Sequence, residues 1–238
     1  MSVSLITLSG FLYLLYYVIY TDVHSIMTWF LLSAAFLPIN ILIVTFIIEG
    51  IISARDKRLM LKKLNMVIGV FYSEVGTVLL KLLTPYNTNS LQSGGDLDFN
   101  SGWTRREYDN AVNIVKNYDY KIESRAGDLT DLKVFLGEKR DFLLRLLENP
   151  NLLEHETFTD LLWAVFHLND ELAHRKSLTG LHNADYNHIS NDIKRAYTLL
   201  LTEWLSYMSH LKSDYPYLYS LAVRTNPFDP DASPEIKE

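Results

Sequence analysis

The chain has 238 residues, no cysteine and a formal net charge of -6, and 48% of its residues are hydrophobic. Without cysteine it can form no disulfide, no thiolate nucleophile and no Cys-ligated metal site. The acidic balance argues against nonspecific nucleic-acid binding, which needs a basic face to displace counterions from phosphates. We therefore expect no nucleic-acid partner.

The charged residues are distributed unequally along the chain. No Lys or Arg precedes Arg55, and the only acidic residues before it are Asp22 and Glu49. This asymmetry separates an apolar N-terminal part, residues 1–54, from a mildly acidic remainder of ordinary composition.

Two apolar runs within residues 1–54, at about 3–20 and 26–52, have lengths suited to crossing a membrane. At 1.5 Å per residue, about eighteen helical residues extend roughly 27 Å, close to a bilayer core of about 30 Å. Pro38 predicts a kink or tilt in the second run. The first run lacks the positive n-region and the small-x-small cleavage site of a signal peptide. We therefore predict a two-helix transmembrane hairpin that is retained in the mature protein.

The orientation of this hairpin follows from the basic residues beside it. The turn between the runs contains no Lys or Arg, whereas five basic residues follow the second run: Arg55, Lys57, Arg58, Lys62 and Lys63. The positive-inside rule then places both termini and the helical domain in the cytoplasm. We predict an integral protein of the inner or plasma membrane, with the lipid bilayer as a partner.

A few polar residues lie inside the predicted spans. Asn40 follows Pro38 closely and can bond to carbonyls freed by the kink. Glu49 is the only ionisable residue within the second run, and an intramembrane carboxylate is a candidate functional group, although water at the cytoplasmic interface can also solvate it. Four tyrosines share one helix face, as an aromatic belt or a ligand-contacting stripe would: Tyr13, Tyr16, Tyr17 and Tyr20.

Residues 55–84 combine the basic cluster with a strongly apolar helix. From Asn65 to Leu83 the only charged residues are Glu74 and Lys81. Such a helix is buried almost all round, lies in the membrane interface, packs in an oligomer or forms a third span. A third span would bury Glu74 near the middle of the bilayer. Residues 85–102 are rich in Asn, Ser and Gly and predict a polar linker.

Residues 103–225 predict a bundle of four helices, followed by a mobile acidic tail over residues 226–238. Thr104 and Glu107 form a capping box at the start of the first helix, which we expect to end at Gly127. The second helix ends at about residue 148, the third covers about 157–176 and the fourth about 183–215. Pro216 then opens a short terminal helix. No strand pattern occurs, so the predicted fold class is all-α.

Carboxylate–histidine spacings in the bundle raise the possibility of a metal site. Glu171 and His174 form a Glu-x-x-His unit, with His167 on the same helix stripe, and Asp185 and His188 form an Asp-x-x-His unit. Such ligands suit iron, manganese or zinc, and paired Glu-x-x-His units occur in di-iron bundles. Against this, Asp is common in a first helical turn, and no inward-facing Glu is evident on the other two helices. The candidate ligands are His167, Glu171, His174 and His188; the competing interpretation is a polar helix face, and we predict no cofactor.

The sequence contains no Gly-rich nucleotide loop and no GxSxG elbow. We therefore predict no catalytic residue and favour a non-enzymatic role. The leading hypothesis is a membrane-anchored helical scaffold or interaction protein that associates with itself or with another membrane protein. One alternative is an oligomeric channel or transporter built from two-span protomers, lined by Asn40, Glu49 and the tyrosine stripe. The other is a membrane-tethered, metal-binding helical bundle.

Overall fold

The computed structural model describes residues 2–89, 102–150, 152, 155–229 and 231–235. The chain divides into two compact units, residues 1–59 and 60–238. Part of the predicted linker and the end of the predicted tail lie outside the described residues, as do the side chains of Tyr20 and Arg58. All secondary-structure elements among the described residues are helices. The only β-pairing among these residues is an isolated bridge between Asn87 and Ile122.

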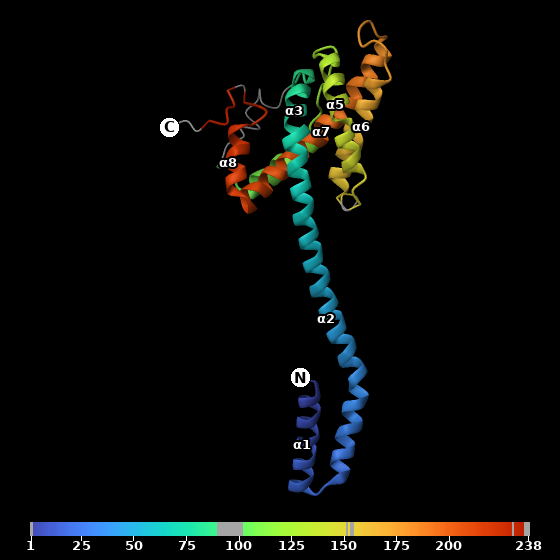
Figure 1. The fold of residues 1–238 in the computed structure, drawn as a ribbon, viewed down its shortest axis with the longest axis vertical. Coiled ribbons are helices and arrows are strands. Elements are labelled where there is room, and N and C mark those ends of the chain that lie inside the picture. The colour runs from blue at the N-terminus through green and yellow to red at the C-terminus, as the bar shows by residue number, and fades with distance from the viewer. Residues whose placement is uncertain (1, 90–101, 151, 153–154, 230, 236–238) are drawn as a thin grey trace. The chain divides into compact units, whose positions relative to one another are not determined.

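The first unit contains a helical hairpin made by α1 (Ser2–Tyr20) and the first part of α2 (Val23–Phe71) (Figure 1). Thr21 ends α1 in the left-handed region, with φ of 48°, and its amide donates to the carbonyl of Tyr17. The carboxylate of Asp22 accepts from the amides of His24 and Ser25 at 3.0 and 3.2 Å, which caps the start of α2. Two residues therefore suffice to reverse the chain.

Large hydrophobic side chains of the hairpin are exposed along its described length. Phe11 is 60% exposed, Trp29 is 63% exposed and Phe46 is 71% exposed. One helix among the described residues, running from Val23 to Tyr86, has the length and composition needed to cross a membrane, whereas the apolar stretch Thr7–Ile19 is shorter. Buried core helices and signal sequences have similar length and composition.

The second unit is an all-helical bundle arranged around α7. After α2 the chain forms a π-helical turn η1 (Tyr72–Gly76), α3 (Thr77–Leu83), a 3-10 turn η2 (Thr84–Tyr86), α4 (Arg105–Asn117), α5 (Leu129–Leu147), α6 (Glu156–Ala173), α7 (Asn183–Asp214) and α8 (Pro216–Arg224). Helix α7 packs against α3, α4, α6 and α8, and α5 packs against α6 (Figure 1). The bundle therefore contains the four helices expected from the sequence and also the preceding segment, from the end of α2 through η2.

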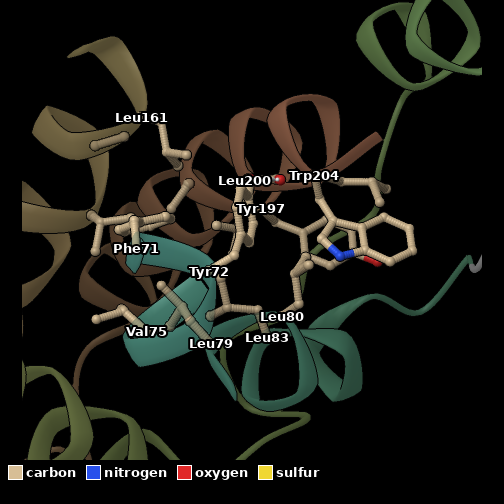
Figure 2. Packing of buried hydrophobic residues seen from close by; sticks show 14 of the residues in the cluster. Phe71, Tyr72, Val75, Leu79, Leu80, Leu83, Leu161, Tyr197, Leu200 and Trp204 are labelled. Atoms are coloured by element: carbon tan, nitrogen blue, oxygen red, sulfur yellow. Dashed lines mark hydrogen bonds between the residues drawn. The ribbon is translucent and has the colours of Figure 1, made fainter. Parts of the chain in front are cut away.

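That segment lies at the centre of the core. Figure 2 shows apolar side chains of the end of α2, η1 and α3 facing those of α6 and α7. Phe71 meets the ring of Phe158 edge-on, with centroids 5.3 Å apart. Tyr72 stacks on Tyr207, again at 5.3 Å, and its hydroxyl donates to the carbonyl of Leu200 at 2.8 Å. Of the placements that the sequence left open for this helix, burial within the domain is the one observed.

Glu74, whose charge weighed against a third span, is exposed. Its carboxylate lies 3.4 Å from the ammonium group of Lys139 on α5. The single acidic residue of this apolar stretch therefore faces outward while its neighbours fill the core, so no buried charge has to be compensated.

The capping box at the start of α4 is confirmed, but the predicted end of that helix is wrong. Thr104 accepts from the amide of Glu107, and the Glu107 carboxylate accepts from the amide of Thr104. Helix α4 stops at Asn117 rather than at Gly127, because the following backbone pairs with the end of η2. The amide of Glu123 donates to the carbonyl of Tyr86, and the amide of Thr88 donates to that of Lys121, both at 2.9 Å. Ile122, expected on the helix, lies in this extended segment.

The C-terminal elements dock on α7. Helix α8 begins at Pro216, as its position predicts. Beyond α8, the ring of Phe228 packs edge-on against Trp204, with centroids 5.3 Å apart, and its amide donates to the side chain of Asn226 at 3.0 Å. The described beginning of the predicted tail is thereby attached to the bundle.

Candidate functional site

Four potential ligands converge on the second unit where α6 and α7 pack together. His167 and Glu171 lie one turn apart on α6, and His188 and Asp192 lie one turn apart on α7. The two helices are consecutive and antiparallel, joined by a turn in which Gly180 has φ of 70°. His167 and Asp192 lie equally far along the sequence from the centre of this turn, and so do Glu171 and His188. In the antiparallel pair of helices, His167 therefore faces Asp192 and Glu171 faces His188.

The reactive atoms of these side chains surround a small common space. The Nε2 atom of His167 lies 3.6 Å from Asp192 Oδ1 and 3.9 Å from Glu171 Oε1. The Nε2 atom of His188 lies 3.5 Å from Glu171 Oε1 and 3.4 Å from Asp192 Oδ2. One ligand atom from each residue can be chosen so that all four lie within 4.8 Å of one another. Two imidazole nitrogens and two carboxylates thus face one point.

Burial differs sharply among the four residues. The side chains of His167 and His188 are about half exposed, at 45% and 51%, whereas that of Asp192 is only 3% exposed. Its Oδ2 atom is buried and has no hydrogen-bond partner within the described structure. The site is therefore a shallow surface centre with one carboxylate at its base.

Two arginines approach the carboxylates from outside the common space. Arg175 donates to Glu171 Oε2 at 2.5 Å and also lies 3.6 Å from Asp185. Arg195 lies 3.5 Å from Asp192 Oδ1. The hydrogen bond from Arg175 is the main reason that the pKa of Glu171 lies below its usual value; burial opposes this shift, and nearby His188 adds to it.

Three of the four ligands predicted from the sequence come together, and one does not. His174 follows the last residue of α6, and its Nδ1 atom lies 2.7 Å from the carbonyl of Asp170, so the ring folds back over the end of the helix. Asp192 takes its place in the cluster. Its signal in the sequence is the four-residue spacing from His188, which mirrors the spacing of His167 and Glu171. The carboxylate of Asp185, the acidic residue of the Asp-x-x-His unit, faces Arg175.

The described polar residues of the hairpin do not all line one groove. A groove of about 400 Å³ is lined by Tyr13 and Tyr16 of the tyrosine stripe together with Ser9, Leu12, Ile26 and Trp29. Asn40 and Glu49 are exposed on α2 and lie outside that lining, as does Tyr17. The basic residues Arg55, Lys57, Lys62 and Lys63 are exposed further along the same helix.

Comparison with known proteins gives the chain a family. A model of the C-terminal helical domain of the uncharacterized protein MJ1433 matches residues 60–224, and a model of its N-terminal helical domain matches residues 1–52. The chain belongs to the MJ1433 family. The MJ1433 protein of Methanocaldococcus jannaschii is 45% identical over 228 residues, which cover 96% of this chain and 92% of the relative.

The two MJ1433 domains correspond to the two structural units: the N-terminal model ends at residue 52, inside the first unit, and the C-terminal model begins at Met60, where the second unit begins. The C-terminal model includes the apolar segment that fills the bundle core, and it contains all four residues of the His–carboxylate cluster. No solved structure matches the chain.

Proposed function

We propose that this protein is a membrane-anchored assembly module: a two-span hairpin holds an α-helical bundle at the cytoplasmic face, and the hairpin associates with further copies or with another membrane protein. The observation that carries the proposal is the exposure of the hairpin. Its large apolar side chains lie open along the described length of both helices, and monomeric soluble proteins rarely expose an apolar surface of this extent.

Helix lengths support the anchoring role. The 19 residues of α1 extend about 28 Å at 1.5 Å per residue, close to a bilayer core of about 30 Å. Helix α2 is longer than a span needs and continues beyond its apolar part into the basic residues. In lipid the exposed apolar side chains are solvated, and each helix satisfies its own backbone hydrogen bonds except where Pro38 in α2 provides no amide hydrogen.

The charge pattern supports the orientation. Basic residues cluster after the second span, whereas the turn carries Asp22 and His24, so the positive-inside rule favours a turn outside the cell and a bundle inside. Glu49 is exposed on α2 only six residues before Arg55, which favours an interfacial position for its carboxylate over a place in a conduction path.

Assembly is favoured over transport for a geometric reason. Two helices enclose no pore, so a channel would require an oligomer, and the groove lined by Tyr13 and Tyr16 does not include Asn40 or Glu49. The apolar faces of the hairpin do offer surface for packing against other helices. An exposed aromatic residue on the bundle, Trp163 at 57%, is a candidate contact for a partner.

Anchoring and orientation are tested with single cysteines, because the natural chain has none to interfere. His24→Cys places a thiol in the turn of the hairpin, and Lys176→Cys places one on the bundle. In intact cells a membrane-impermeant maleimide should label the His24→Cys protein only, and permeabilisation should expose the Lys176→Cys protein. Recovery of the protein in the soluble fraction without detergent would overturn the anchor, and the reverse labelling pattern would overturn the orientation.

Assembly is tested separately on the purified protein in mild detergent or nanodiscs. Light scattering coupled to size exclusion should give a protein mass above the 27.5 kDa of one chain, or show a co-purifying membrane protein. A strictly monomeric protein with no partner would refute the assembly role while leaving the anchor intact.

A further inference from the structure

We propose that His167, Glu171, His188 and Asp192 bind one divalent first-row transition-metal ion, with Zn²⁺ as the probe ion. This site lies within the bundle and does not depend on the membrane role proposed above. It also departs from the expectation that the protein needs no cofactor.

The spacing of the ligand atoms is the first support. The four nitrogen–oxygen separations between the histidines and the carboxylates, 3.4–3.9 Å, are all longer than a hydrogen bond of about 2.7–3.2 Å, so these groups converge and still leave space between them. For metal–ligand distances of about 2.0–2.1 Å, the edges of a tetrahedron measure about 3.3 Å. One ligand atom from each residue already lies within 4.8 Å of the others, so an inward movement of the side chains is needed to reach that size.

The buried carboxylate is the second, independent support. Asp192 is 97% buried, and its Oδ2 atom has no hydrogen-bond partner while facing the Nε2 atom of His188 at 3.4 Å. An unsatisfied carboxylate oxygen in such a place is costly. A cation held between Asp192 and the two imidazoles removes that cost and occupies the space between the side chains.

The surrounding arginines leave the ligand atoms available. Arg175 holds Glu171 through Oε2, so Oε1 is the atom that faces the cluster, and Arg175 shares its charge with Asp185. Arg195 approaches Oδ1 of Asp192, but its side chain is 59% exposed, so solvent screens its charge. Both arginines orient a carboxylate in the way that outer-shell residues orient metal ligands.

The donor set indicates the class of ion. Two imidazole nitrogens with two carboxylate oxygens suit Zn²⁺, Fe²⁺ or Mn²⁺, whereas Ca²⁺ and Mg²⁺ prefer sites made only of oxygen. Because two ligands come from each of two helices, the ion would link α6 to α7. Metal binding should therefore raise the melting temperature of the bundle.

The experiment uses the full chain, purified in mild detergent without a polyhistidine tag and stripped with a chelator. Zn²⁺ titration by calorimetry, with metal content measured after dialysis, should give about one equivalent per chain. His188→Gln and Asp192→Asn should each weaken binding by more than about tenfold, since loss of even an outer-shell partner costs 10–100-fold. The matched control is His174→Gln, just beyond the end of α6 and outside the cluster, which should bind like the natural protein.

Two results would overturn the proposal. One is uptake below about a tenth of an equivalent by the stripped natural protein in micromolar Zn²⁺. The other is equal loss of binding in the His174→Gln and His188→Gln proteins, which would indicate scattered surface histidines. His188 is half exposed, so its substitution keeps the fold even if Asp192→Asn disturbs it, and circular dichroism of the metal-free variants verifies this.

Discussion

The two ends of helix α2 contain similar residues and have opposite environments. From Met27 to Lys57 every described residue is exposed, whereas Leu64, Ile68 and Phe71 are at most 2% exposed. Isoleucine, leucine and phenylalanine are frequent in both segments. In the later segment, exposed side chains such as Met66 and Val70 alternate with the buried ones, so only one face of the helix packs against the rest of the bundle. The earlier segment presents apolar side chains on every face, which is what a lipid-facing helix requires.

Two phenylalanines of α2 provide the strongest test of this contrast. Phe71 is fully buried against Phe158, so Phe71→Ala should leave a cavity and lower the free energy of unfolding of the bundle by about 3–5 kcal/mol. Phe46 is 71% exposed, and Phe46→Ala should leave bundle unfolding unchanged. Urea unfolding in detergent, followed by near-ultraviolet circular dichroism, measures both. Equal destabilisation by the two substitutions would mean that the hairpin shares the core.

Two glycines of the bundle, Gly76 and Gly137, also differ in the space around them. A Cβ atom at Gly76 would overlap the ring of Tyr72 and lie 3.0 Å from that of Phe71, whereas one at Gly137 on α5 would meet no atom within 4 Å. Gly76→Ala should therefore destabilise the bundle by about 1–3 kcal/mol through overpacking. Gly137→Ala should stabilise it by up to about 1 kcal/mol, because alanine is the better helix former. A neutral Gly76→Ala protein would show that the π-helical turn can open and accommodate a methyl group.

Local signals in the sequence predicted the fold where the stabilising contacts are themselves local. The capping box at Thr104 and Glu107 and the helix start at Pro216 involve residues only a few positions apart, and the structure has both. The end of α4 was missed because the pairing that stops it joins Tyr86 to Glu123, across a stretch of chain that no local pattern spans. The burial of Tyr72 and Leu79 likewise depends on α7, far along the sequence.

In the candidate site, too, local spacing predicts some ligands, whereas another depends on how two helices pack. His167 and Glu171 could be placed on one helix face from spacing alone, and His188 was identified as a potential ligand. Asp192 was not, because which face of α7 turns toward α6 depends on the register of the antiparallel pair. The sequence pattern extends this helix to about residue 176 and so predicts His174 on the same stripe, whereas α6 ends at Ala173.

Helix ends exposed to water offer a smaller test. The α4 capping box gives the amides of Thr104 and Glu107 side-chain acceptors, so Thr104→Ala should lower bundle stability by about 1 kcal/mol. Thr104→Ser keeps the hydroxyl group and should retain most of the stability that Thr104→Ala loses. The midpoint of urea unfolding compares the three proteins. If serine fails to rescue, the threonine methyl group rather than its hydroxyl stabilises the turn.

The smallest expected effect concerns a histidine that the bundle partly buries. Burial is the main reason that the pKa of His210 lies below its usual value; the Asp214 carboxylate 2.8 Å from Nδ1 opposes this shift, and Lys62 adds to it. Because the unfolded chain then takes up the proton at higher pH than the folded one, stability should fall as pH drops through about 6.5, the ordinary histidine value, towards the lowered one. His210→Gln should flatten this part of the profile of unfolding free energy between pH 7.5 and 5. A profile that the substitution leaves unchanged would assign the pH dependence to other groups. The hairpin contains one histidine, His24, which is exposed in the turn, so a bundle residue is the expected origin.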